Sequence, residues 1–176
     1  MKEKVLFFDI DGTLVDNSYG VHKVPEGVKR ELKRIQNDGH KLFICSGRPK
    51  AMINQQFLDL GFDGYVLYNG GYIEIDGKSI FEERMDTELA TQTVDMLEEL
   101  NCDYMIETAH HIYIDKCYKE LYTFFKNLGM EEMFSMDFDR DDVLKRAIKI
   151  EANVTNKDKQ KVSDYLDGKF GTTISF

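Results

Sequence analysis

The 176-residue chain carries 32 acidic and 23 Lys or Arg side chains, a formal net charge of −9 at pH 7, and 42% of its residues are hydrophobic. This composition is typical of a globular protein, and the net acidity argues against nucleic acid or a membrane surface as a partner, since both require basic patches. The apolar run near the N-terminus ends at Asp9, too early for a secretory signal, and no run reaches the ~20 residues of a membrane span. Three cysteines without paired spacing, Cys45, Cys102 and Cys117, indicate reduced thiols, so we expect a cytoplasmic protein.

The first 75 residues predict alternating strands and helices. Apolar and β-branched runs at 4–8, 41–45 and 65–68 predict three strands. Apolar residues with helical spacing follow Pro25 and again Pro49, where each proline favours the start of a helix. This strand–helix–strand–helix–strand order predicts a Rossmann-like parallel sheet with right-handed crossovers.

The pattern changes after residue 71, where a hairpin is expected around Asp76-Gly77. Helices are expected at 86–100, 118–128 and 156–166, and strands at 104–107, 112–115, 147–152 and 172–176. Antiparallel pairs mixed with helices predict a separate α+β unit. We therefore predict an α/β chain with a Rossmann-like core at 1–81 and a second unit at 82–176.

Two carboxylates stand at the end of the first predicted strand, in "LFFDIDGTLVD" (residues 6–16). Asp9 can attack phosphorus as a carboxylate nucleophile, and Asp11 can protonate the leaving oxygen and then activate water. A bound Mg²⁺ would offset the repulsion between these carboxylates and a phosphate. Gly12 allows the backbone to approach that phosphate. The alternative interpretation is a plain Asp-Gly turn that terminates the strand.

Polar groups also follow the second and third predicted strands. Ser46, Gly47 and Arg48 come after the second strand, where the Ser46 hydroxyl can bind a phosphate oxygen, and Asn69 comes after the third. Ser-Gly-Arg-Pro also suits an ordinary turn, and Arg48 suits a surface cation. Because ligands of parallel sheets bind beyond the carboxyl ends of the strands, we expect these groups to share one phosphate-binding site.

These segments together resemble the haloacid-dehalogenase-like hydrolase superfamily. "FFDIDGTLV" is similar to its DxDGT signature, "FICSGRP" to its second motif, and "YNGGYI" to the strand-end Asn-Gly of its Cof-type sugar-phosphatase branch. The resemblance implies that Asp9 is the nucleophile, Asp11 the general acid and base, and Ser46 a phosphate ligand. It also implies that Asp9 and the backbone carbonyl of Asp11 bind Mg²⁺, and that residues 82–176 form the cap that selects the substrate.

Two features of that superfamily are absent from the sequence. None of the 13 glycines is followed by Asp, so the Gly-Asp motif that completes the metal site is missing. The superfamily also needs a downstream lysine that balances the charge of the nucleophile and the phosphate. The predicted helix at 156–166 carries Lys157, Lys159 and Lys161, but their alternation with other polar residues is typical of a solvated face, so none of them is assigned that role. In the family's strand order, the first strand would also lack a neighbour and form an exposed edge. We therefore expect an N-terminal part of a longer enzyme.

The sequence thus predicts a Mg²⁺-dependent phosphatase that hydrolyses a small phosphorylated metabolite, such as a sugar phosphate, through an aspartyl-phosphate. The 176-residue chain alone is expected to be inactive. One alternative is a non-catalytic module that binds phosphate or a partner, with self-association through the exposed edge strand. Another is a phosphomutase, which needs only a different phosphoryl acceptor.

Overall fold

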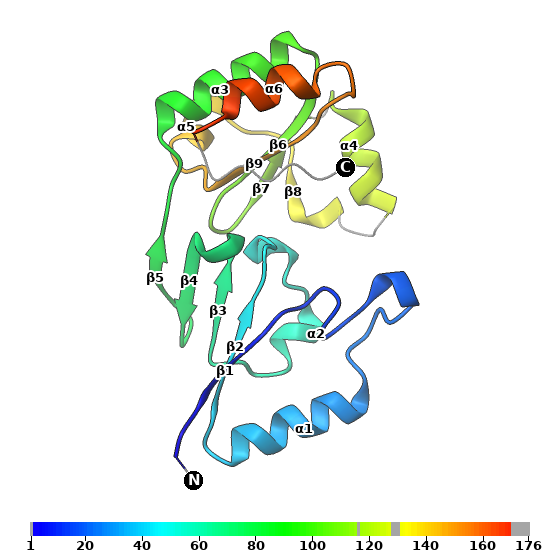
Figure 1. The fold of residues 1–176 in the computed structure, drawn as a ribbon, viewed down its shortest axis with the longest axis vertical. Helices are drawn as coiled ribbons and strands as arrows, with labels where there is room; N and C mark the ends of the chain where they lie inside the picture. The colour runs from blue at the N-terminus through cyan, green and yellow to red at the C-terminus, as the bar shows by residue number, and fades with distance from the viewer. Residues whose placement is uncertain (1, 116, 128–130, 170–176) are drawn as a thin grey trace.

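The computed structural model describes residues 2–115, 117–127 and 131–169 of the chain. Figure 1 shows two parts stacked along the long axis of the molecule, each organised around one sheet. Parallel strands with helical crossovers dominate the first part, and antiparallel strands with helices make up most of the second. This architecture confirms the predicted α/β class. No helix in the described ranges is both long and apolar enough to cross a membrane.

A five-stranded sheet organises the first part, with its strands in chain order. The strands are β1 (Val5–Phe8), β2 (Lys41–Cys45), β3 (Gly64–Leu67), β4 (Tyr72–Ile75) and β5 (Lys78–Glu82). β1, β2 and β3 run parallel, whereas β4 and β5 form an antiparallel hairpin. The three parallel strands therefore end at one edge of the sheet, as the alternation of strands and helices predicts.

The helix α1 (Glu26–Asn37) packs against this sheet (Figure 1). It begins directly after Pro25, whose fixed φ suits the first turn and whose missing N–H costs nothing there. Leu32 of α1 joins the same core cluster as Leu42 and Ile44, which are completely buried in β2. The amphipathic spacing in the sequence is therefore used to cover the parallel strands.

The prediction of a single helix after Pro49 is wrong. The structure has two short pieces instead, η2 (Lys50–Met52) and α2 (Gln55–Leu58), separated by extended backbone. The Arg48 guanidinium donates to the carbonyl of Met52 at 3.3 Å, and a continuous helix would use that carbonyl internally. The helical spacing of apolar residues survives the break because both pieces still face the core.

A four-stranded sheet organises the second part, in the order β8-β7-β6-β9. Its strands are β6 (Asp103–Glu107), β7 (Ile112–Ile114), β8 (Phe134–Ser135) and β9 (Lys149–Asn153). β6 pairs antiparallel with both β7 and β9. Strands were predicted at these three positions, whereas the pairing of β6 with β9 was not. The strand predicted at 172–176 lies outside the described residues.

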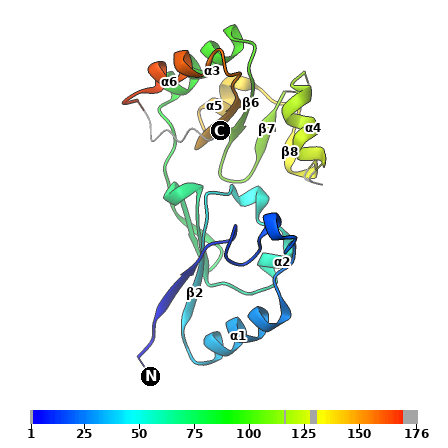
Figure 2. The same cartoon turned by 45° about the vertical axis from the view of Figure 1, so that its right-hand side comes forward.

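Helices pack on both faces of this second sheet (Figures 1 and 2). The helices are α3 (Thr87–Glu99), α4 (Lys119–Asn127), α5 (Arg140–Leu144) and α6 (Lys159–Leu166). Tyr104 and Ile106 of β6 pack into one cluster with α3, α5 and α6. Met105, between them, points to the opposite face and packs with Leu121 of α4, because successive strand residues face opposite sides.

Several contacts join the parts, among them a hydrogen bond and a shared apolar cluster. The Tyr68 hydroxyl, just beyond β3, donates to the Thr108 carbonyl in the β6–β7 turn at 2.5 Å, and burial raises the pKa of Tyr68 well above its ordinary value. Met52 of η2 belongs to the same apolar cluster as Met105. The α4-side face of the second sheet is therefore directed toward the carboxyl ends of the parallel strands.

The strand β1 lies at the edge of its sheet, paired with β2 on one side. Val5 and Phe7 on this strand are 54% and 60% exposed. The predicted edge position is therefore confirmed.

Gly64 in β3 has no room for a side chain, which makes it a test of the sheet packing. A Cβ at this position would overlap the Glu74 carbonyl oxygen and the Phe43 ring. We expect Gly64→Ala to lower the free energy of unfolding by ~2 kcal/mol or more, measured by urea denaturation. Gly27→Ala is the matched control, because it lies in α1 with open space around it and should be neutral or stabilising. Equal stabilities of the two variants would contradict this account.

Candidate active site

A cavity of about 450 Å³ lies at the carboxyl ends of β1, β2 and β3, bounded by both parts of the molecule. Its lining residues are Asp9, Asp11, Ser46, Gly47, Arg48, Pro49, Met52, Asn69, Phe125, Lys149 and Glu151. The structure thus brings together all of the residues predicted to form the site except Gly12, which lies in the turn directly after Asp11.

The turn after β1 is fixed by Ile10. Its side chain is completely buried in the core, and its carbonyl accepts three N–H groups of the following residues at 3.0–3.3 Å. Gly12 takes a left-handed backbone (φ +81°) and donates to Val15 at 2.7 Å, a conformation that costs glycine little. Because Ile10 points inward, Asp9 and Asp11 on either side of it are exposed at the cavity.

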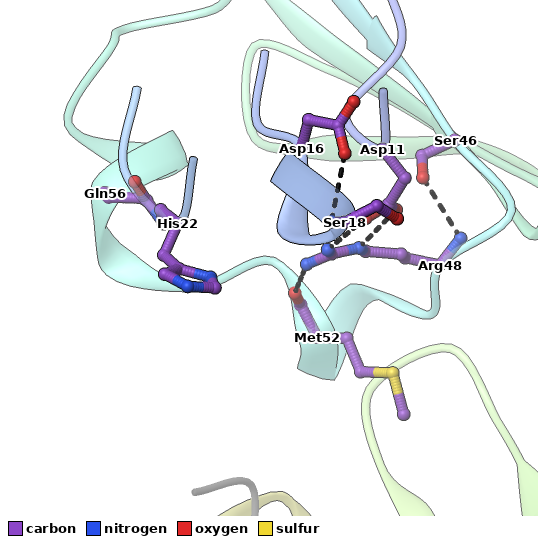
Figure 3. Close-up of polar contacts among 8 residues, drawn as sticks. All are labelled: Asp11, Asp16, Ser18, His22, Ser46, Arg48, Met52 and Gln56. Atoms are coloured by element: carbon purple, nitrogen blue, oxygen red, sulfur yellow. Dashed lines mark hydrogen bonds and ion pairs between the residues drawn. The ribbon is translucent and has the colours of Figure 1, made fainter. Parts of the chain in front are cut away.

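Arg48 binds Asp11 through two parallel contacts (Figure 3). Its Nε lies 2.8 Å from one carboxylate oxygen of Asp11, and its Nη2 lies 2.6 Å from the other. Its remaining Nη1 donates to the Met52 carbonyl at 3.3 Å. Bidentate guanidinium–carboxylate pairs are strong and directional. In this state Arg48 is therefore a partner of Asp11, an arrangement that the sequence did not reveal.

Two anchors hold the loop that carries Arg48. At its start the Ser46 amide donates to β3 at 2.9 Å, and the Ser46 hydroxyl accepts from the Arg48 amide at 3.2 Å. At its end Lys50 forms an ion pair with Glu74, which also accepts from the Tyr72 hydroxyl at 2.9 Å. Burial works to raise the pKa of Glu74, but the hydrogen bonds from Lys50 and Tyr72 outweigh it and hold that pKa below its ordinary value. The loop is therefore a rigid support for the cavity.

Asn69 reaches the cavity through strained backbone. Both Tyr68 and Asn69 have left-handed conformations, with φ of 54° and 55°, and the Asn69 amide donates to the Ser46 carbonyl at 3.3 Å. A Cβ on Gly47 would come within 2.8 Å of the Asn69 side-chain oxygen. The absence of a side chain at Gly47 therefore lets the side-chain amide of Asn69 lie against the turn that follows Ser46.

The second part contributes residues that the sequence analysis did not assign to the site. Phe125 of α4 and two charged residues of β9, Lys149 and Glu151, line the same cavity. Lys149 and Glu151 are two apart on a strand and so share a face. The signal was present in the sequence as charged residues alternating with apolar ones in 147–152, but the face they occupy depends on pairing with distant strands.

Behind Lys149 lies a buried carboxylate, Glu107, directly opposite it across β6 and β9. The Lys149 ammonium lies 3.2 Å from Glu107 and 2.8 Å from Glu151. Glu107 is completely buried, and burial raises its pKa to about 7. Burial works to lower the pKa of Lys149, but the attraction of both glutamates outweighs it and raises that pKa.

The oxygen donors at the cavity fit a hard divalent cation that keeps some of its water. Asp9 and Asp11 both line the cavity with carboxylates, and Mg²⁺ is commonly bound by one or two carboxylates together with water and phosphate. Within the described parts of the chain, no group of three or more His, Cys, Asp or Glu side chains is arranged to hold a metal. The donor set is therefore compatible with a Mg²⁺ held partly by water and ligand oxygens.

The fold and the cavity together define a class of protein. A carboxylate pair, a hydroxyl, an amide and a guanidinium converge at the ends of a parallel sheet beneath a second α+β unit. Residues 6–176 match the model of the haloacid dehalogenase-like hydrolase family. The chain belongs to this family, which confirms the superfamily that its motifs indicate.

Curated relatives share part of this chain. YkrA of Bacillus subtilis (strain 168), provisionally named a phosphatase, is 32% identical over 82 residues, which cover 47% of this chain and 31% of YkrA. Phosphatase YwpJ of the same organism is 27% identical over 120 residues, covering 67% of this chain and 41% of YwpJ. The chain thus spans less than half the length of either relative.

Solved structures share the fold. The sugar phosphatase BT4131, of haloacid dehalogenase subclass IIB, superposes with a TM-score of 0.73 at 23% identity, covering 94% of this chain and 64% of that one. TM0651 from Thermotoga maritima gives a TM-score of 0.78 at 17% identity, covering 96% of this chain and 64% of that one. These likenesses extend across both parts of the described molecule.

The buried Glu107 gives a pH-dependent stability. Because its pKa is about 7 in the folded state against 4.5 ordinarily, the folded protein retains a proton that the unfolded chain releases. This contribution is full below about pH 4.5 and is lost as the pH rises through about 7. The charges facing Glu107 are Lys149 and Glu151, with the Tyr68 hydroxyl also coupled to it.

We therefore expect the free energy of unfolding of the wild type to fall, relative to that of Glu107→Gln, by about 3 kcal/mol between pH 4.5 and pH 8. Urea denaturation at several pH values measures the difference. Glu88→Gln, an exposed position at the start of α3, is the control and should show no such trend. A difference between wild type and Glu107→Gln that does not change with pH would contradict the assignment.

Proposed function

We propose that the chain carries the phosphate-binding and nucleophilic part of a Mg²⁺-dependent phosphatase. The substrates are small phosphate monoesters such as sugar phosphates, and the reaction passes through an aspartyl-phosphate. The observation that carries the proposal is the shared cavity at three neighbouring strand ends, which joins Asp9 and Asp11 to Ser46 and Asn69. Residues 1–81 are the core of this phosphatase and residues 82–176 its cap.

In the proposed reaction an Asp9 carboxylate oxygen attacks phosphorus, and the bond from phosphorus to the ester oxygen breaks. Asp11 gives its proton to that leaving oxygen, which departs as an alcohol. Asp11 then takes a proton from water, the hydroxyl attacks the aspartyl-phosphate, and inorganic phosphate leaves Asp9 free again. Ser46 and Asn69 hold the phosphate oxygens. Mg²⁺, held by Asp9 and the Asp11 carbonyl, would neutralise charge that develops on the phosphoryl group.

Arg48 has to change partner for this chemistry to proceed. A carboxylate in a bidentate pair with a guanidinium accepts two hydrogen bonds and is poorly placed to carry a proton. A substrate phosphate would compete for the same guanidinium and free Asp11 to act as the acid. Arg48 is thus proposed to bind the phosphate when substrate is present and to pair with Asp11 when substrate is absent.

The cavity lacks a cation dedicated to the phosphate among the described residues that line it. Arg48 is paired with Asp11, and Lys149 is paired with two glutamates. A phosphatase of this design needs a further lysine and another carboxylate for its metal. We therefore propose that the 176 residues alone bind phosphate but hydrolyse esters slowly or not at all.

A non-catalytic interaction module is the second candidate, favoured by one observation. Phe7 is 60% exposed on the edge strand β1, and unprotected edge strands favour pairing with another chain. Binding of a partner or a second copy through β1 would then be the function of the 176 residues.

Replacing the nucleophile separates the two candidates. Asp9→Asn, in the product of the complete open reading frame, should lower Mg²⁺-dependent hydrolysis of p-nitrophenyl phosphate by about 1000-fold or more, because an amide cannot form the acyl-phosphate. Asp59→Asn, an exposed position after α2 and outside the cavity, is the matched control and should retain wild-type rates. Undiminished hydrolysis by Asp9→Asn would refute the phosphatase mechanism. Absence of hydrolysis in every protein would favour the interaction module.

A further inference from the structure

The side of the cavity opposite Asp9 and Asp11 is built by the second part of the molecule. Lys149 and Glu151 from β9 and Phe125 from α4 line it. A phosphate held at the strand ends would direct the rest of the ester toward these three residues. Their chemistry therefore decides which leaving groups the cavity accepts.

Lys149 is held in place and keeps one donor available. Its ammonium has three N–H groups, of which two are directed to Glu107 and Glu151 at 3.2 and 2.8 Å. Glu107 is completely buried opposite it, and its second oxygen has no hydrogen-bond partner among the described residues. This arrangement fixes the ammonium from behind, while the Lys149 and Glu151 side chains remain 35% and 45% exposed.

The charge of this cluster is balanced or slightly negative. The positive charge of Lys149 is cancelled by Glu151, and Glu107 adds a negative charge whenever it is ionised. A second phosphate or a carboxylate on the ligand would therefore meet no surplus positive charge there. A neutral hydroxylated group would find both a donor and acceptor oxygens within the same small area.

We propose, as an extension of the proposed function, that Lys149 and Glu151 select monophosphates of uncharged polyhydroxy compounds. The Lys149 ammonium donates to one ligand hydroxyl and the Glu151 carboxylate accepts from a neighbouring one, while Phe125 forms an apolar wall. Esters that carry a second phosphate are disfavoured by the glutamate charge. Glu107 is a positioning residue that holds the ammonium in place.

Removing the negative charge of Glu151 should weaken the preference for a monophosphate over a bisphosphate. In the product of the complete open reading frame, wild type is expected to prefer fructose 6-phosphate over fructose 1,6-bisphosphate by about tenfold or more in kcat/KM. Glu151→Gln should reduce that ratio by about tenfold, because it removes the charge that repels the second phosphate. The exposed control Glu88→Gln should leave the ratio within about twofold of wild type. A wild-type preference for the bisphosphate, or a ratio unchanged in Glu151→Gln, would overturn the proposal.

A binding measurement separates this inference from the proposed function. Calorimetric titration of the Asp9→Asn protein with the same two fructose esters reports selection without turnover. Preference for the monophosphate, reduced by an added Glu151→Gln, supports the inference even when no variant hydrolyses an ester. Absence of binding to both esters, or equal binding of both, would overturn it. Asp9-dependent hydrolysis of p-nitrophenyl phosphate together with unselective binding would leave the phosphatase proposal standing and this one refuted.

The role of Lys149 is tested in a background that protects the fold. Lys149→Met alone leaves two carboxylates without their cation, so it is combined with Glu107→Gln, and urea denaturation verifies that the double variant folds. Relative to Glu107→Gln alone, the double variant should bind fructose 6-phosphate about tenfold more weakly in the Asp9→Asn protein. The exposed Lys161→Met on α6 is the matched control. Equal affinity of the double variant and Glu107→Gln would remove Lys149 from the proposal.

Discussion

The convergence of β1, β2 and β3 at one edge of a parallel sheet is the constraint on which the site depends. Each strand contributes backbone that ends at the same place, so residues nearly 60 positions apart become neighbours. The buried side chain of Ile10 then fixes which residues can face that place. Because it points into the core and its carbonyl closes the turn, Asp9 and Asp11 are directed outward. The packing of Ile10 in the core therefore also determines the outward orientation of the two aspartates.

Contacts between the second sheet and the loops at the strand ends fix the position of that sheet relative to the cavity. The hydrogen bond from Tyr68 to Thr108 ties the β6–β7 turn to the end of β3, next to Asn69. The shared apolar cluster of Met52 and Met105 ties the α4-side face of that sheet to the loop after Arg48. The residues that hold the second part in place are thus sequence neighbours of residues that line the cavity at the strand ends. Movement between the parts would change the cavity and these contacts together.

The predictable parts of this molecule are those written in local patterns. The strand ends at Asp9, Ser46 and Asn69 follow from short apolar runs and turn residues, and parallel topology then implies that they meet. The pair between Arg48 and Asp11 could not be predicted, since it depends on where a guanidinium lies after the chain has crossed a helix. The same guanidinium also donates to the Met52 carbonyl, in the segment where the helix predicted after Pro49 is interrupted. Lys149 and Glu151 were visible as alternating charges, but the buried partner of Lys149, Glu107, lies 42 residues away on another strand.

Charge balance at the cavity connects its two sides. Three carboxylates line it, on Asp9, Asp11 and Glu151, against the two cations Arg48 and Lys149, and Glu107 lies behind Lys149. The two cations are already paired with carboxylates, so Asp9 remains without a compensating charge among the lining residues. A phosphate ester brings further negative charge of about −1.5 to −2 near neutral pH. Attraction to such a ligand therefore requires positive charge from outside this set of side chains. The uncompensated negative charge of Asp9 supports the proposal that a divalent cation binds at this carboxylate, which is proposed to attack phosphorus.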